Sequence, residues 1–274
     1  MSIGTSHLLN AYKHIHLLNG YSLPKNKGTL FKYIPLERFV QSVDSNELVF
    51  VSPIIWNDPF EQFFLNIDLS KRGYPKEDIA CMCVSEKSSK NEDACWRVYG
   101  ESKKAVRVSI KYDELFRLLE DYSSDNECEV YVGKVVYSLK RKEIEELCED
   151  SSKHHKDYFP KKISREHYLS LMLLKRDAFD YENEVRIFLV KNKLQFDDKK
   201  LIHLNCDYKK IGILENVMLS PYPPVNPLQD LAFSVRKKIN EKESSELKRI
   251  LHDKLQCKIY QSRLYEVRDI VLHL

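Results

Sequence analysis

Glycine is scarce in this sequence, with seven residues among 274. Neither G-x-G-x-x-G nor G-x-x-x-x-G-K-S/T occurs, which excludes both common glycine-rich loops that cradle nucleotide phosphates. The sequence also lacks an apolar run of 18 residues and a basic N-terminal segment followed by an apolar one. We therefore expect neither a membrane span nor secretion, and we expect a cytoplasmic protein with no membrane partner.

The chain also lacks the spacing of a metal site. Its seven cysteines are an odd number and are scattered, which predicts reduced thiols in a chain without a secretory signal. Cys81 and Cys83 are too close together for the usual zinc pair, and no second pair follows. None of the nine histidines belongs to an H-E-x-x-H motif. No metal is expected.

Charge of one sign is not in excess either, because the net charge is only +3. Basic residues gather locally at 140–146, 153–162 and 235–249. Such stretches fit a solvated helix face of mixed charge or a surface that follows phosphates, and the first interpretation is favoured. With 43% hydrophobic and 31% charged residues, the composition is that of a folded soluble protein.

Hydrophobic periodicity predicts one domain over residues 1–274, with a helical and loop lead-in at 1–28 and a core at 29–274. Strands are predicted at 29–34, 47–52, 79–86, 104–110, 129–138, 181–190, 201–206, 210–220 and 265–274. Helices are predicted at 35–43, 95–100, 112–122, through most of 139–180, and at 228–239 and 244–255. The predicted fold is α+β, with a mixed, mainly antiparallel central sheet and flanking helices.

Four groups of polar and aromatic residues fall at predicted strand ends or in adjoining loops, where binding sites concentrate. They are Lys32 with Tyr33; the stretch from Ser52 to Glu61; Ser85 and Glu86 with Trp96 and Tyr99; and Glu182, Glu184 and Arg186.

The charged residues Glu182, Glu184 and Arg186 alternate along a predicted strand, so all three point to one face. One interpretation is an exposed face of an edge strand, with the arginine neutralising two glutamates. The other is a pair of carboxylates that converge on a substrate and are oriented by the arginine. Crowding of like charges would then raise the pKa of one glutamate.

The stretch Ser52 to Glu61, SPIIWNDPFE, joins two apolar runs. Pro59 confines Asp58 to an extended conformation, and Asn57 and Asp58 can bond to nearby backbone, which predicts a rigid turn. Two aromatic residues, Trp56 and Phe60, beside such a turn would also form a wall against which a planar ligand could stack.

Trp96 and Tyr99 are three residues apart on one face of a predicted helical turn. The pair fits core packing better than a base-stacking platform. Ser85 and Glu86 place a hydroxyl and a carboxylate at a strand end. Because no G-x-S-x-G motif occurs, Ser85 is not predicted to be a hydrolase nucleophile.

The order of these motifs resembles a bacterial family called "domain of unknown function 2971". The resemblance runs from Thr29 to the segment SRLYEV near the C-terminus, and its specific parts are NDPFE and E-x-E-x-R. Where that family often has a tryptophan before the glutamate motif, this sequence has Phe179. An aromatic residue is thus kept.

The beginning of the chain is similar, more weakly, to toxins that resemble ADP-ribosyltransferases, especially those that modify nucleic acid. This resemblance implies a polar residue on the first strand (Lys32 or Tyr33), a strand-end hydroxyl (Ser52) and a catalytic glutamate (Glu184). At the first position such enzymes usually have arginine or histidine, whereas lysine donates only as a point charge.

The same resemblance implies NAD as the substrate and an oxocarbenium-like centre that a carboxylate stabilises. Glu184, Ser52 and Lys32 would be catalytic, and aromatic residues would stack the nicotinamide ring. The binding residues would be Tyr33, Asn57, Asp58, Phe60, Glu61, Ser85, Trp96, Tyr99, Glu182 and Arg186.

Three functions follow as hypotheses. The first is an NAD-consuming, ADP-ribosyltransferase-like effector, a bacterial toxin or phage-defence protein that modifies a nucleic acid or a protein. The second is an effector that cleaves nucleic acid with the same carboxylates and a divalent metal. The third is a non-catalytic sensor or a neutralising partner in a defence system, with the NDPFE segment and Trp96 forming a binding groove.

Overall fold

The computed structural model describes residues 12–22, 28–65, 74, 77–86, 92–99, 104–140, 142, 145–146, 162–221 and 233–264. These residues form an α+β fold with a mixed sheet in which most neighbouring strands are antiparallel, as predicted. The parallel pairs in this sheet are β1 with β6 and β11 with β12. None of the described helices is long and apolar enough to span a membrane.

Ten strands of the described chain form the main sheet, in the order β1-β6-β9-β4-β2-β5-β11-β12, with β3 and β10 on a branch from β4. They are β1 (Ile15–Leu17), β2 (Thr29–Pro35), β3 (Glu47–Val51), β4 (Asp78–Ser85), β5 (Ala105–Lys111), β6 (Glu129–Lys134), β9 (Glu184–Lys191), β10 (Leu201–Asn205), β11 (Leu214–Leu219) and β12 (Lys258–Gln261). Two short parallel strands, β7 (Val136–Leu139) and β8 (Leu174–Arg176), form a second sheet.

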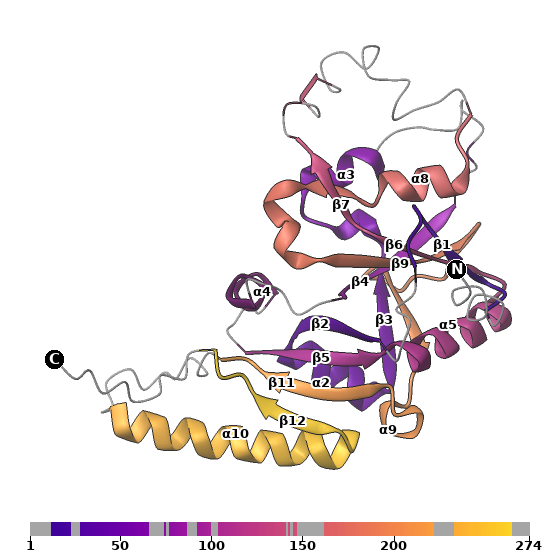
Figure 1. Cartoon of the computed structure of the whole chain (residues 1–274). Coiled ribbons are helices and arrows are strands. Elements are labelled where there is room, and N and C mark those ends of the chain that lie inside the picture. Colours follow the sequence, from indigo (N-terminus) through magenta and orange to yellow (C-terminus); the bar gives the residue numbers. More distant parts are fainter. Residues whose placement is uncertain are drawn as a thin grey trace, which may run out of the picture.

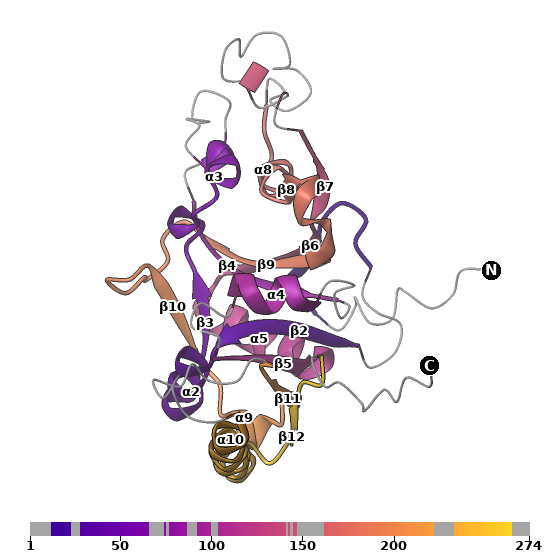
Figure 2. The same cartoon turned by 90° about the vertical axis from the view of Figure 1, so that its left-hand side faces the viewer.

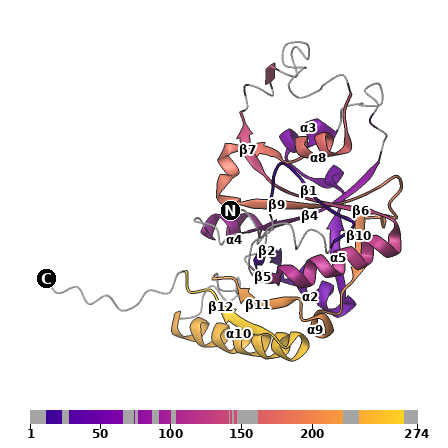
Figure 3. The same ribbon diagram turned by 45° about the vertical axis from the view of Figure 1, so that its right-hand side comes forward.

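The helices are α2 (Leu36–Ser45), α3 (Pro59–Leu65), α4 (Glu92–Tyr99), α5 (Tyr112–Asn126), α8 (Arg165–Leu171), α9 (Tyr208–Ile211) and α10 (Phe233–Leu255). Two 3-10 turns, η1 (Pro53–Ile55) and η3 (Asp177–Glu182), precede α3 and β9. In all views α3, α8 and β7 lie at one end of the molecule, and α10 lies beside β12 at the opposite end (Figures 1 and 3).

The sheet forks at β4. This strand pairs with β9 along its whole length, but on its other side it meets β3 at Cys81 and β2 at Ser85. Lys32 of β2 lies in the fork, where its Nζ donates a hydrogen bond of 2.9 Å to the carbonyl oxygen of Cys83. Helix α4 lies between the β4–β9 part and the β2–β5 part of the sheet (Figure 2).

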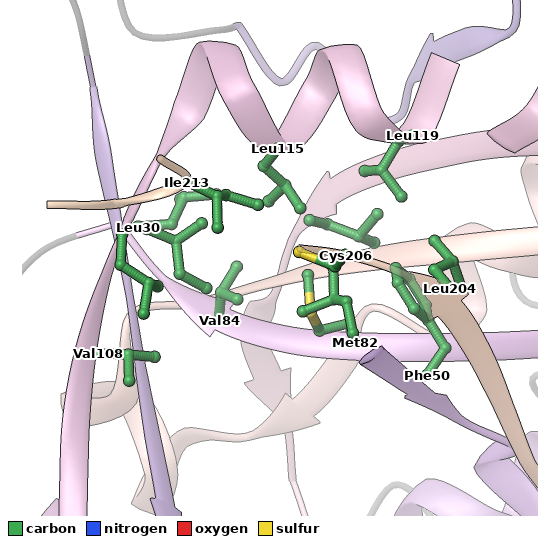
Figure 4. Close-up of a cluster of buried hydrophobic side chains, with 14 of the residues drawn as sticks. Leu30, Phe50, Met82, Val84, Val108, Leu115, Leu119, Leu204, Cys206 and Ile213 are labelled. Atoms are coloured by element: carbon green, nitrogen blue, oxygen red, sulfur yellow. The ribbon is translucent and has the colours of Figure 1, made fainter. Parts of the chain in front are cut away.

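The two faces of the β4–β6–β9 region pack against different cores. Val185, Ile187 and Leu189 of β9 point into the larger core, with side chains of α2, α5 and α10. Figure 4 shows this core, where Leu115 and Leu119 of α5 lie over the strands. The opposite face carries Phe188 and Val190 of β9 into a second core beneath α3 and α8. Alternation along β9 therefore places Glu184 and Arg186 on the side of α3 and α8.

Several predicted element boundaries are wrong. Within the predicted helical and loop lead-in, residues 15–17 form a strand that pairs with β6. The predicted helix over 164–179 ends at Leu171 and is followed by β8 and η3. The two predicted late helices are one, α10, although residues 228–232 lie outside the described part. The strand predicted at 265–274 lies outside it as well.

The predicted strand over 129–138 is broken at Val135 into β6 and β7. Gly133 does not mark a bulge, because the β6–β9 register continues through it without a shift. A Cβ atom on this glycine would lie 2.3 Å from Cδ1 of Leu173, so any side chain at this position would force Leu173 to shift.

Candidate functional site

Five charged side chains from four separate elements meet beside β9. We call them the ion cluster: Glu61 of α3, Lys175 of β8, Glu182 of η3, and Glu184 and Arg186 of β9. Each side chain is less than 10% exposed. The structure thus brings the NDPFE and E-x-E-x-R motifs, more than 100 residues apart in the sequence, into direct contact.

Lys175 contacts all three carboxylates of the ion cluster. Its Nζ lies 2.6 Å from Oε2 of Glu182, 3.0 Å from Oε2 of Glu184 and 3.4 Å from Oε1 of Glu61. An ammonium group has three N–H donors, so it can serve one carboxylate with each.

Arg186 forms the second half of the ion cluster. Its Nε donates to Oε1 of Glu184 at 2.9 Å, and its Nη2 reaches Oε2 of Glu184 at 3.2 Å and Oε1 of Glu61 at 2.5 Å. The remaining nitrogen, Nη1, donates to the carbonyl oxygen of Met172. The indole ring of Trp56 covers the guanidinium group, with 4.4 Å between Cζ and the ring centroid.

The rigid turn in SPIIWNDPFE is the start of helix α3. Oδ1 of Asp58 accepts a hydrogen bond of 2.9 Å from the backbone N–H of Phe60, and Pro59 occupies the first helical position, where no N–H is needed. The apolar run after the turn is therefore helical. This geometry directs Trp56 and Glu61 to the ion cluster.

The other oxygen of Asp58 binds Arg176 of β8, with 2.9 Å between Oδ2 and Nη2. The Arg176 guanidinium also lies 4.3 Å from the ring centroid of Phe60 and 5.0 Å from that of Phe179. Lys175 Nζ is likewise 5.0 Å from the Phe179 centroid. Phe179 therefore packs against both cations of β8.

The expectation that Glu182 extends the strand is wrong. Glu182 ends the 3-10 turn η3, and Asn183 follows in the left-handed conformation with φ of 46°. The turn still directs the Glu182 carboxylate to Lys175. The edge-strand interpretation is also wrong, because β9 lies between β4 and β6 and is buried on both faces.

Glu184 is held in its ionised form. Burial opposes ionisation, but the charges of Arg186 and Lys175 outweigh it and hold the pKa of Glu184 well below its usual range. The same contacts raise the pKa of Lys175 and of Arg186 against the effect of burial. The backbone N–H of Glu184 donates to the hydroxyl of Tyr137 at 2.8 Å, which fixes the start of β9.

Glu182 differs from Glu184 although both bind Lys175. Burial and the neighbouring Glu184 raise its pKa, and Lys175 only partly offsets this. Three carboxylates share two cations, so one negative charge is in excess when all five groups are ionised. Tyr99 of α4 lies beside Glu182 and Glu184, and its pKa is raised by burial and by both carboxylates.

Helix α4 carries its aromatic residues into a small separate core. Trp96 is 1% exposed and makes an edge contact with Tyr33, with 4.9 Å between ring centroids. Tyr33 also stacks on Tyr99 at 6.4 Å, and burial raises the pKa of Tyr33 to about 12. Trp96 and Tyr33 therefore pack against each other, and Tyr99 connects this core to the ion cluster.

The remaining predicted site residues differ in their distance from the ion cluster. Ser85 is adjacent, since its Oγ donates to the carbonyl oxygen of Glu182 at 2.7 Å. Lys32 does not contact the ion cluster in this way, because its Nζ donates to the carbonyl oxygen of Cys83 on β4. Asn57 is exposed. Ser52 does not lie beside Glu184. The preceding residue, Val51, pairs with Cys81 of β4, and Cys81 pairs with Phe188 of β9. Phe188 is four residues from Glu184, which corresponds to about 13 Å along the strand.

Sequence reasoning missed Lys175, Arg176 and Tyr137. Lys175 and Arg176 fall in a segment with helical periodicity, where a lysine and an arginine after an apolar stripe indicate a solvated face. The one available signal is charge: a segment with Glu182 and Glu184 so near in sequence needs basic partners if it is to be buried.

The described residues contain no group of three or more histidine, cysteine, aspartate or glutamate side chains arranged to hold a metal ion. In the ion cluster the ammonium group of Lys175 occupies the point where three carboxylates converge. The donor set is thus arranged around a lysine.

Comparison with known proteins gives one match. Residues 95–187 match the model of a family described as "Protein of unknown function (DUF2971)". The matched region begins at Cys95 in α4 and includes Lys175, Glu182, Glu184 and Arg186, while the Trp56–Glu61 stretch precedes it. No curated protein and no solved structure matches the chain. The predicted resemblance to this family is confirmed over residues 95–187.

Proposed function

We propose that the chain is an NAD-consuming enzyme similar to ADP-ribosyltransferases, with Glu184 as its reacting carboxylate. The observation that carries the proposal is the state of Glu184, which Lys175 and Arg186 keep ionised at the start of a central strand. A group held in this way offers fixed negative charge and does not act by transferring a proton.

Fixed negative charge suits the chemistry of NAD cleavage. When the bond between the ribose and nicotinamide breaks, positive charge develops on the sugar, and a preorganised carboxylate stabilises it. The excess of one negative charge in the ion cluster adds to this field, because two cations do not neutralise three carboxylates. A carboxylate can also accept a hydrogen bond from a ribose hydroxyl and orient the sugar.

The surrounding aromatic residues divide into support and binding roles. Trp96 is buried and Trp56 covers Arg186, so these two rings support the site. Tyr99 is partly exposed and lies beside Glu182 and Glu184, which makes it the candidate for stacking on the nicotinamide ring. The resemblance to toxins supports a bacterial toxin or phage-defence effector whose acceptor is a nucleic acid or a protein.

The test is to incubate the purified protein with labelled NAD and a bacterial cell extract, and to measure both transferred label and free nicotinamide. We expect the wild type to consume NAD and Glu184→Gln to be slower by about 10²–10³-fold, the usual effect of removing one preorganised charge-stabilising group. The matched control is Glu77→Gln, which weakens the ion pair between the buried Glu77 and the partly exposed Arg165. Glu77 precedes Asp78, which pairs with Lys191 at the opposite end of β9 from Glu184. A wild type that leaves NAD intact, or an undiminished Glu184→Gln, would refute the proposal.

A second candidate is a non-catalytic sensor or binding partner in a defence system. It is supported by the hydrogen bonding of the ion cluster, because both oxygens of Glu184 already accept hydrogen bonds from Lys175 and Arg186 and the Glu184 side chain is only 6% exposed. This candidate predicts no thermal shift with NAD and recovery of one stoichiometric partner in a pull-down.

A further inference from the structure

We propose that Lys175 is the positioning residue of this site: its ammonium group holds Glu61, Glu182 and Glu184 in place and thereby fixes the carboxylate of Glu184. The part of this inference that concerns catalysis rests on the proposed function. The part that concerns the carboxylates themselves does not, and it can be tested without NAD.

The three carboxylates come from α3, η3 and β9, and Lys175 contacts each of them within 3.4 Å. Arg186 contacts Glu61 and Glu184. Among the described residues, Lys175 is the cation that reaches all three carboxylates, so it joins the turn η3 and the helix α3 to the start of β9.

With Lys175 removed, three buried carboxylates would share the single charge of Arg186. Buried like charges cannot all remain ionised, so at least one carboxylate must take up a proton or turn to solvent. Glu184 would then lose one of the two cations that hold its charge and orientation.

An ammonium group is a compact point charge with three donors, whereas a guanidinium group is a larger planar fork whose donors all lie in one plane. Three carboxylates approaching from three elements match the ammonium group. Lysine is therefore specific here, and arginine is not an equivalent replacement.

Other charged and titratable groups also face these carboxylates and belong in any account of their titration. They are Arg186 on β9, Cys83 on β4, Tyr99 on α4, Tyr137 on β7 and Tyr181 in η3. Arg186 is the one permanent cation among these groups. The neutral thiol and hydroxyl groups therefore cannot replace the positive charge that is lost with Lys175.

The experiment follows the side-chain carboxyl carbons of ¹³C-labelled glutamate by NMR through a pH titration. Glu61→Gln, Glu182→Gln and Glu184→Gln assign the three signals. We expect Lys175→Met to raise the pKa of Glu184 by about one unit or more, the size of effect that an opposite charge at this distance produces. Arg165→Met, which breaks the ion pair with Glu77, should leave all three signals where they are in the wild type.

If Lys175→Met does not fold, the double variant Lys175→Met/Glu182→Gln removes one charge of each sign and keeps the net charge of the ion cluster. Its Glu184 signal is compared with that of Glu182→Gln alone, and the pKa of Glu184 should still be higher in the double variant. In Lys175→Ala, added methylammonium should return the Glu184 titration toward that of the wild type, while methanol should not.

NAD consumption separates this inference from the proposed function. If the wild type consumes NAD, Lys175→Met should lower the rate by about 10²-fold, as misplacement of a reacting group does, and Lys175→Arg should not restore it. If the wild type leaves NAD intact, the proposed function is wrong. The NMR titration alone then shows whether Lys175 holds the carboxylate of Glu184 in place. An unchanged Glu184 titration in Lys175→Met, or in the charge-balanced double variant, overturns the inference whatever the enzyme does.

Discussion

Replacing Arg186 by methionine should destabilise the fold strongly. Arg186 is 1% exposed, and its guanidinium group binds Glu184, Glu61 and the carbonyl oxygen of Met172 beneath the ring of Trp56. Removing one member of a buried ion pair costs about 3–5 kcal/mol, because the partner charge remains buried. Here two carboxylates lose a partner at once, so we expect a loss at the upper end of that range.

The loss can be measured by urea or thermal unfolding followed by circular dichroism. At about 2 °C per kcal/mol for a chain of this size, the melting temperature should fall by about 8–10 °C. Arg117→Met is the control, since Arg117 is 62% exposed and pairs with Glu114 on the surface of α5. That change should alter the free energy of unfolding by no more than about 0.5 kcal/mol.

The double variant Arg186→Met/Glu184→Met tests the reason for the loss. It removes one charge of each sign, so the remaining Glu61, Glu182 and Lys175 keep the net charge of the ion cluster. Apolar replacement of both partners is often near neutral, so the double variant should be more stable than Arg186→Met by about 2 kcal/mol or more. A loss of stability below about 1 kcal/mol in Arg186→Met would show that the ion cluster does not depend on Arg186. A double variant whose loss equals the sum of the two single losses would show that Arg186 and Glu184 are not coupled.

Three further predictions concern single sites. Asp58→Ala should cost about 1–2 kcal/mol because it removes the cap of α3, while Asp58→Asn should cost less because an amide oxygen can still accept from Phe60; urea unfolding measures both. Gly133→Ala should cost about 1–3 kcal/mol because its Cβ would clash with Leu173, and Leu173→Val should recover part of that loss; equal stability of Gly133→Ala and the wild type would contradict this. At His203, burial opposes protonation, but Asp197 and Glu47 outweigh it and raise the pKa above the ordinary value of 6.5. Protonated His203 therefore stabilises the fold fully below pH 6.5, and this stabilisation is lost as the pH rises through the raised pKa. Between these two pH values the melting temperature of the wild type should fall more than that of His203→Gln, which has no imidazole to titrate.

Most of the sheet could be predicted from the sequence because its strands carry strong local signals. The alternation of Val185, Ile187 and Leu189 with charged residues identifies β9 and the faces of its side chains, and the structure agrees. Strand β8 has three residues and is stabilised by its pairing with β7, a contact across about 40 residues of sequence. The local pattern after α8 indicates more helix, so a tertiary contact overrides it there.

The charged and aromatic groups of the site could be identified, but their burial could not. Glu61, Glu182, Glu184 and Arg186 are recognisable as unusual, and the structure places all four in one cluster. Lys175 has no local signal of its own, because a lysine is ordinarily solvated. Only the fold shows that it meets three carboxylates. Ser52 illustrates the reverse case, since it was predicted to be catalytic together with Glu184, whereas the register of β3 on β4 places it toward the other end of β9.

We propose that Glu184 is an ionised carboxylate that promotes cleavage of NAD. The most direct measurement is the initial rate of nicotinamide release by purified wild type, Glu184→Gln and Glu77→Gln, each shown by circular dichroism to be folded. We expect the wild type and Glu77→Gln to release nicotinamide, and Glu184→Gln to release it at a rate lower by about 10²–10³-fold. No release by the wild type, or equal rates for the wild type and Glu184→Gln, would contradict it.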